Sequence, residues 1–169
     1  MLVSDMSTIS ANMRGMTETN WLTQREERAW RAYRRMQTVL PAQLARDLVR
    51  DSALTDPDYD VLSTLSERPG HRWQLRDLAA KMLWSRSRLS HHIARMESRG
   101  LVAREDDPAD RRGCMIVLTE DGRRTLDKAA PQHVASVREH FVDLLTDDEI
   151  ATLTQLAERV VDRLSQPRP

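Results

Sequence analysis

The stretch 85–99 combines residue types that can bind nucleic acid with the spacing of a single helix. It holds four arginines against one acidic residue, Glu97. An α-helix turns about 100° per residue, so a buried face made by Leu89, Ile93 and Met96 fixes which side chains point away from the core. Arginine can bond O6 and N7 of guanine together, and small residues allow close approach to a groove. The outward and flanking positions are occupied by Ser87, Arg88, Ser90, His91, Ala94, Arg95 and Ser98.

The start of this helix is suited to an anion. Ser85 stands at the expected N-cap, and Arg86 and Ser87 follow it. The free amides and the dipole of a helix N-terminus favour negative charge, and serine hydroxyls can donate to phosphates or base edges. We therefore expect this end of the helix to contact duplex DNA.

A hairpin with arginines at its tip follows the helix. Gly100 can end the helix because it adopts positive φ without strain. The runs 101–104 and 115–118 are typical of strands, and the polar loop between them carries Arg111 and Arg112. Arginines at such a tip can enter a minor groove or contact the DNA backbone. A helix, a turn, a second helix and this hairpin together predict a winged helix-turn-helix.

Further helices must position this unit. Apolar residues spaced by three, four and seven predict a helix over 21–50, which Pro41 should kink or split. Asp56 is the expected N-cap of the next helix, with Pro57 at its first position. The remaining expected elements are a short strand over 71–74 that can pair with the hairpin, a helix over 75–82, a helix from Thr119 interrupted by Pro131, and a last helix capped by Thr146.

The first and last helical segments carry apolar stripes outside the helix-turn-helix. A lone winged helix cannot cover both stripes, so we expect a homodimer; the alternative is that the two segments pack on each other within one chain. The expected fold is mainly α with a small β-wing, a winged helix-turn-helix with N- and C-terminal dimerisation helices. Its parts are a disordered lead over 1–20, a dimerisation helix over 21–54, a DNA-binding domain over 55–122 and C-terminal dimerisation helices over 123–169.

The composition argues against several other classes. The formal net charge is +0, so nucleic-acid binding must come from a local patch. One cysteine allows no intrachain disulfide and favours the cytoplasm, and no apolar run approaches the length of a membrane span. Ser90 and His91 are adjacent on a helix and do not face each other, and no phosphate loop, paired carboxylates or metal cluster is evident. We expect no enzyme, no cofactor, no metal and no membrane partner.

Four segments resemble the MarR (multiple antibiotic resistance regulator) family: Leu78–Ser90, Met96–Val102, Asp107–Gly113 and Val117–Arg123. The resemblance implies an α-helical winged-helix homodimer with interlocking terminal helices. It also implies a repressor, less often an activator, that binds pseudo-palindromic promoter DNA. One departure is Leu83, where many relatives carry glycine. Carried over by position, the residues facing DNA are Ser85, Ser87, Arg88, Ser90, His91 and Arg95, with Arg111 and Arg112 in the wing and Asp110 orienting one of those arginines.

The same resemblance implies an effector. Many relatives release DNA when a small aromatic or phenolic acid enters a cleft between the dimer helices and the DNA-binding part. Trp84, in the turn between helices, and Trp73 beside it can line such a cleft, and ordinary core packing is the alternative for each aromatic. The candidate ligand-binding residues are Trp30, Tyr33, Tyr59, Trp73 and Trp84.

Two other functions stay open at this point. Cys114 is a candidate redox sensor, although it begins a wing strand, whereas relatives place the sensing cysteine near the first helix. A small strand residue is the structural alternative for Cys114. A winged helix can also use its exposed face to bind a protein instead of DNA.

Overall fold

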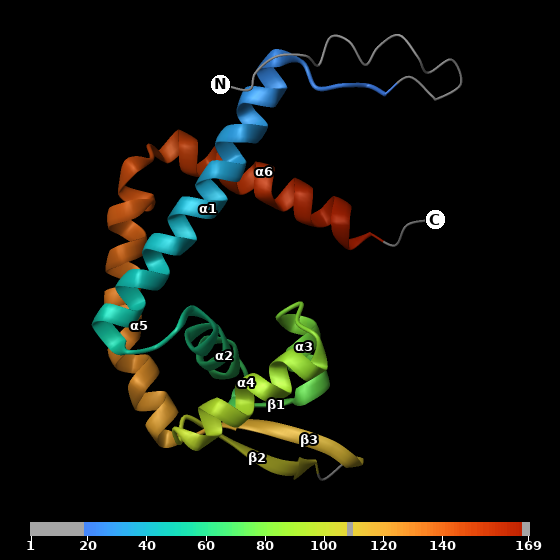
Figure 1. Cartoon of the computed structure of the whole chain (residues 1–169), viewed down its shortest axis with the longest axis vertical. Helices are drawn as coiled ribbons and strands as arrows, with labels where there is room; N and C mark the ends of the chain where they lie inside the picture. The colour runs from blue at the N-terminus through green and yellow to red at the C-terminus, as the bar shows by residue number, and fades with distance from the viewer. Residues whose placement is uncertain (1–18, 108–109, 167–169) are drawn as a thin grey trace, which may run out of the picture. The chain divides into compact units, whose positions relative to one another are not determined.

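The computed structural model describes residues 19–107 and 110–166, apart from the side chains of residues 110–112. These residues form six α-helices, two short 3-10 helices and a three-stranded antiparallel sheet, which confirms the expected class of mainly α with a small β-wing (Figure 1). No described helix is long and apolar enough to cross a membrane. The chain divides into two compact units between Thr38 and Val39.

The described part of the first unit is mainly the beginning of α1, Gln24–Ser52. A capping box starts this helix: the Glu26 amide donates to Thr23 Oγ1, and the Thr23 amide donates to the Glu26 carboxylate at 2.7 Å. Each described residue of this unit is exposed, including Trp30 and Tyr33. The predicted apolar stripe of this segment therefore has no cover within the unit.

Neither internal proline ends its helix. Helix α1 runs on through Pro41, and α5, Glu120–His140, runs on through Pro131. Of the two alternatives for Pro41, a kink or a split, the split is therefore excluded, and Pro131 does not break the later helix. An internal proline costs a helix about 3 kcal/mol, and both helices bury apolar residues in the second unit, Leu48 and Leu126, that offset this cost.

Helix α2, Asp56–Ser66, begins at the residue predicted to be its N-cap, one residue earlier than expected. Thr55 is the N-cap: its hydroxyl accepts from the Asp58 amide at 3.3 Å, and the Asp58 carboxylate accepts from the Thr55 amide at 3.0 Å. This reciprocal capping box satisfies two backbone donors, whereas Asp56 at the N-cap would satisfy one. Asp56 and Pro57 are consequently the first two residues of the helix.

The sheet contains β1, Arg72–Gln74, β2, Val102–Asp107, and β3, Asp110–Leu118, in the order β1-β3-β2. The predicted pairing of 71–74 with the hairpin is confirmed, because β1 pairs antiparallel with β3. The hairpin is longer than predicted: the ladder continues through Glu105 opposite Met115 and Asp106 opposite Cys114. Charged side chains can occupy the exposed face of a hairpin. The additional strand residues are largely charged, so their sequence resembled that of a polar loop.

The core of the second unit lies among α2, the helix-turn-helix, the sheet and the start of α5 (Figure 1). Helix α3 spans Leu75–Lys81 and α4 spans Arg86–Ser98, and both contribute fully buried residues. The cap predicted for the last helix is confirmed, since Thr146 accepts the Glu149 amide, and Thr119, the predicted start of α5, is the N-cap of that helix. The buried apolar residues are Leu48, Leu54, Val61, Leu62, Leu65, Leu78, Ala79, Leu89, Ile93, Met96, Leu101, Val102, Ile116, Leu118, Leu126 and Ala129.

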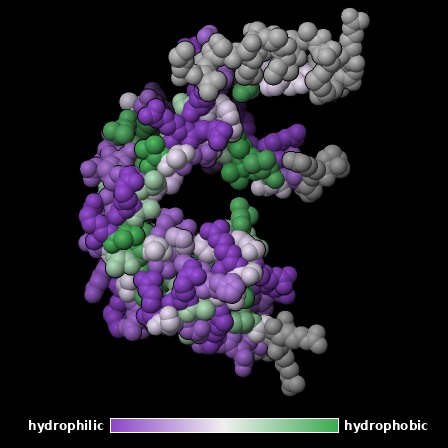
Figure 2. Space-filling model, in the orientation of Figure 1, coloured by the Kyte–Doolittle hydropathy of each residue, from purple (hydrophilic) through white to green (hydrophobic). Residues whose placement is uncertain are grey.

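Helix α6, Asp147–Ser165, follows the 3-10 helix η3, Val142–Leu144, and buries no residue. Its apolar stripe includes Leu156, Val160 and Leu164, and the last of these is 73% exposed. Figure 2 shows apolar side chains at the surface over this helix. A helix of this length gains most of its stability from packing an apolar face, so α6 requires a cover that the described chain does not supply.

Candidate nucleic-acid interface

Helix α4 presents one buried face and one exposed face, as its periodicity predicted. Leu89, Ile93 and Met96 each have an exposed fraction of 0%. Ser85 caps the helix, because its hydroxyl accepts from the Arg88 amide at 3.2 Å. The side chains on the open face are those of Arg86, Ser87, Arg88, His91, Ala94, Arg95 and Ser98, which are all exposed.

The turn between α3 and α4 has the hydrogen bonds of a Schellman motif. The Leu83 amide donates to Ala80 O at 3.1 Å, and the Trp84 amide donates to Ala79 O at 2.9 Å. Leu83 occupies the position that usually holds glycine, with φ of 55° and 93% of its surface exposed. The departure noted in the sequence therefore places a strained leucine at the surface of the turn, where its side chain has almost no packing.

Arg88 and Trp84 are stacked. The Arg88 guanidinium carbon lies 4.0 Å from the centre of the Trp84 ring. The edge of the same ring meets the imidazole of His92, with the planes at 83° and the centres 5.6 Å apart. Trp84 was expected to line an effector cleft, and the structure places it against Arg88, an arginine of the exposed face of α4.

Arg95 is also held by His92. The Arg95 guanidinium donates to His92 Nδ1 at 2.9 Å, and His92 itself is 6% exposed. Burial lowers the pKa of His92, and the neighbouring Arg95 lowers it further while Asp58 opposes the change. The imidazole is therefore neutral near pH 7, as an acceptor for an arginine must be.

Asp58 is the buried acid behind α4. Its carboxylate accepts from Arg99 Nη1 at 2.7 Å, and Arg99 also donates to Ala53 O at 3.3 Å. Burial raises the pKa of the Asp58 carboxyl, but the hydrogen bonds from Arg99 and Thr55 outweigh it and hold the pKa below its ordinary value. Arg99 is one of the four arginines of the stretch 85–99. In the structure it connects the end of α4 to the start of α2 and to the residue that follows α1.

Ser90 is less available for contact with DNA than its position on the helix predicted. It is half-buried, and its carbonyl and hydroxyl oxygens both accept from Arg104 Nη2, at 2.8 and 3.3 Å. The Arg104 amide donates to Glu97 at 3.2 Å, so β2 is tied to α4 at two points. The hydroxyl hydrogen of Ser90 is still able to donate. Sequence reasoning missed Arg104, because its partners lie on a different element.

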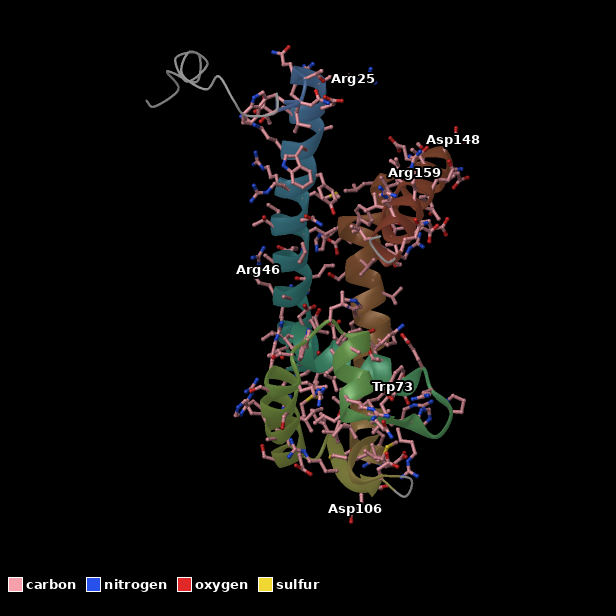
Figure 3. The ribbon with its side chains drawn as sticks, turned by 90° about the vertical axis from the view of Figure 1, so that its right-hand side faces the viewer. Arg25, Arg46, Trp73, Asp106, Asp148 and Arg159 are labelled. Carbon is pink, nitrogen blue, oxygen red and sulfur yellow. The ribbon has the colours of Figure 1, made fainter. Side chains whose placement is uncertain are left out.

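The wing arginines lie at the end of the hairpin. Asp110, Arg111 and Arg112 are part of β3, and Asp110 pairs with Asp107, but the side chains of all three lie outside the described residues. Asp106, near this end, is labelled in Figure 3. The predicted contacts of these three side chains with DNA therefore stay predictions.

The aromatic residues predicted to bind an effector have separate surroundings. Trp30 and Tyr33 lie with their ring centres 5.7 Å apart in the first unit. In the second unit the ring centres of Tyr59 and His133 lie 4.4 Å apart. The guanidinium carbon of Arg68 lies 4.5 Å from the ring centre of Trp73. A cavity of about 390 Å³ beside β1 and α3 has none of these aromatics in its lining, which consists of Arg68, Pro69, Arg72, Gln74, Arg76, Asp77, Asp107 and Met115.

Cys114 is half-buried in β3, where its thiol lies 3.8 Å from Met115 O. It faces Asp106 across the ladder. Among the described residues, no three histidine, cysteine or acidic side chains are grouped to hold a metal ion.

Comparison with known proteins gives consistent results. The model of the MarR family matches residues 54–114. The transcriptional regulator HosA of Escherichia coli O111:H- is 36% identical over 109 residues, 64% of this chain and 78% of that protein. The crystal structure of AbsC, a MarR family transcriptional regulator from Streptomyces coelicolor, is 44% identical with a TM-score of 0.82, covering 86% of this chain and 98% of that one. Sco3205, a MarR family regulator from the same organism solved in complex with DNA, is 38% identical with a TM-score of 0.84, covering 89% and 94%.

Proposed function

Because this chain belongs to the MarR family of transcriptional regulators, we propose that it binds a pseudo-palindromic promoter site in duplex DNA as a homodimer and represses transcription there. Helix α4 enters the major groove, and the hairpin of β2 and β3 contacts the neighbouring minor groove or backbone. Two-fold symmetry then sets the half-sites about one helical turn apart, ~34–36 Å.

The exposed face of α4 is the observation that carries this proposal. It joins Arg86, Arg88, His91 and Arg95 to small residues in a protein whose formal net charge is +0. An excess of positive charge on this face suits local contact with phosphates and guanines. Sco3205, similar over 89% of this chain, was solved bound to DNA, and this supports the same use here.

The exposed stripes supply the argument for the homodimer. Helix α6 leaves Leu153, Leu156 and Val160 between 37% and 57% exposed, and the start of α1 leaves Trp30 at 51%. Each stripe, taken by itself, exceeds the scattered apolar exposure that is normal for a soluble surface. A second copy of the chain covers both. Leu156→Glu is expected to convert the dimer to a monomer in sedimentation equilibrium, and a dimer of unchanged affinity would refute this use of α6.

DNA binding can be tested by fluorescence anisotropy on the DNA upstream of the protein's own gene. We expect binding to that DNA to be much tighter than to random duplex, and the logarithm of affinity to fall with the logarithm of salt concentration. The slope counts the phosphates that the arginines neutralise. The proposal would be contradicted if the protein bound the DNA upstream of its own gene, and the neighbouring promoters, no more tightly than random duplex.

Repression and effector control are the finer parts of the proposal. A dimer seated on a promoter blocks polymerase, so transcription in vitro from a template carrying the site should fall as protein is added. We propose a small aromatic or phenolic acid as effector, with Trp30, Tyr33, Tyr59, Trp73 and Trp84 as the candidate residues. A panel of benzoic and hydroxybenzoic acids should raise the anisotropy Kd for DNA, and the absence of any response would remove this part alone.

A further inference from the structure

We propose that Trp84 and His92 form a platform, the Trp84–His92 pair, that positions Arg88 and Arg95 for contact with bases. Both rings are positioning residues, because they act through the two arginines. The inference rests on the proposed binding of DNA by α4. It adds which groups behind the exposed face of α4 set the specificity of that binding. It also gives Trp84 a task other than the predicted binding of an effector.

The first half of the platform is the stack of Arg88 on Trp84. The guanidinium carbon lies 4.0 Å from the ring centre, so the ring covers one flat face of the cation. The five N–H donors of a guanidinium lie around its rim, in its own plane. Stacking therefore restricts the plane of Arg88 and leaves its rim able to bond O6 and N7 of a guanine.

The second half is the hydrogen bond from Arg95 to His92 Nδ1 at 2.9 Å. A guanidinium can only donate, so Nδ1 must be the unprotonated nitrogen and the ring hydrogen must be on Nε2. This bond orients the head of Arg95 from the side that faces the protein. The remaining donors of Arg95 are left for the groove.

The imidazole is itself held from behind. His92 Nε2 lies 3.2 Å from Asp58 Oδ1, although outside hydrogen-bond geometry, and Asp58 is 2% exposed. Arg99 and the Thr55 amide fix that carboxylate at 2.7 and 3.0 Å. A buried acid beside Nε2 favours the hydrogen on that nitrogen, which is the form that Arg95 requires.

The two halves are one unit because the rings touch. The edge of Trp84 meets His92 with the planes at 83°. Displacing either ring therefore disturbs the support of both arginines. The two arginines are seven residues apart on α4, about two helical turns, so the Trp84–His92 pair, half-buried at Trp84 and buried at His92, orients donors along much of the exposed face.

Protonation of His92 breaks the second half of this arrangement. The protonated ring donates from both nitrogens, so it has no acceptor for Arg95 and repels it. The charged groups that face the ring are Arg88 and Arg95 from α4 and Asp58 from α2, with the backbone of Pro57 nearby. Acidification should therefore lower discrimination between specific and random DNA, while the added positive charge keeps general affinity for phosphates from falling.

The test compares wild type with Trp84→Leu, His92→Phe and His92→Asn. Affinity for specific and for random duplex is measured by anisotropy at about pH 7.5 and about pH 5.5. Trp84→Leu should lower specific affinity about two- to fivefold, the effect of an exposed cation–π contact, with random affinity and salt slope unchanged. His92→Phe keeps a ring against Trp84 but removes the acceptor, and should lose about threefold to tenfold of specificity.

His92→Asn is the matched control, because its amide oxygen takes the place of Nδ1 and does not titrate. Because it lacks the ring that meets Trp84, its specificity should lie between those of wild type and His92→Phe, and it should not depend on pH in this range. If Trp84→Leu does not fold, Trp84→Phe replaces it: its smaller ring attracts Arg88 more weakly and should lower specific affinity, by less than the factor given for leucine, with random affinity unchanged.

The outcomes separate the two claims. A wild type without sequence-specific binding would overturn the proposed function itself. The platform would be overturned if wild type binds its site specifically but the substitutions of Trp84 and His92 lower specific and random affinity equally. It would also be overturned if they alter neither affinity. A specificity ratio of His92→Phe that equals the ratio of wild type would overturn the role of His92.

Discussion

Exchange of the residues at two helix ends gives a matched test of local strain. Helices α3 and α4 both end in a Schellman motif: Leu83 has φ of 55° in the first, and Gly100 has φ of 71° in the second. A Cβ built on Gly100 meets no atom within 4 Å, and Leu83 is 93% exposed. Leu83→Gly and Gly100→Ala therefore change backbone strain in opposite directions, with little change in packing.

The expected magnitudes follow from two opposing terms. A left-handed conformation costs a residue with a side chain about 1–2 kcal/mol, and glycine adds about 0.4–1 kcal/mol of conformational freedom to the unfolded chain. Leu83→Gly should consequently stabilise the fold by about 0.5–1 kcal/mol. Gly100→Ala should destabilise it by a similar or slightly larger amount. For a chain of this size, 1 kcal/mol corresponds to about 2–4 °C in Tm.

The assay is thermal unfolding followed by far-UV circular dichroism, at one protein concentration because a dimer's Tm depends on it. The free energy from urea unfolding, followed by tryptophan fluorescence, provides a second value. A Leu83→Gly variant that is no more stable than wild type would refute the reasoning. The leucine would then have a contact that outweighs its strain, and DNA affinity of the same variant would show whether that contact is to the nucleic acid.

Three further predictions concern the support of the fold and of α4. Gly122→Ala should destabilise by about 3 kcal/mol or more in urea unfolding, because a Cβ there would overlap the carbonyl of Leu101. Asp47 is buried and accepts four hydrogen bonds that hold its pKa well below the ordinary 3.8. Wild-type stability should therefore decline as pH falls below about 3.8, and Asp47→Asn should lose the part of that decline that comes from Asp47, while the part from Asp58 remains. Arg104→Gln should weaken specific DNA binding about threefold to tenfold by freeing Ser90 and the wing, with an unchanged salt slope; a slope lower by about one would mean that Arg104 contacts a phosphate instead.

Periodicity predicted the helices of this chain well, since a buried face requires apolar residues at fixed spacing. It predicted the hairpin less well. Residues 105–107 and 110–114 are largely charged or small, and an exposed two-stranded ladder places no constraint on their hydropathy. The N-cap of α2 was predicted one residue late, because Thr55 and Asp56 are both good caps and only the reciprocal bond with Asp58 distinguishes them.

The candidate site shows the same division. The exposed face of α4 followed directly from Leu89, Ile93 and Met96. His92 lies on the buried side of that helix, three residues after Leu89 and one before Ile93, and its spacing indicated burial although its polarity did not. The contact of Arg104 with Ser90 joins two elements, so no pattern within either element could predict it.

The most direct test of the central claim is the affinity of Arg88→Ala/Arg95→Ala for the specific site and for random duplex. Arg46→Ala, which removes an exposed arginine of α1, is the matched control (Figure 3). We predict that the double substitution lowers specific affinity by about 2–4 kcal/mol, that it lowers random affinity much less, and that Arg46→Ala changes neither. Unchanged specific affinity of the double variant would contradict the account, because α4 would then not be the element that contacts the bases.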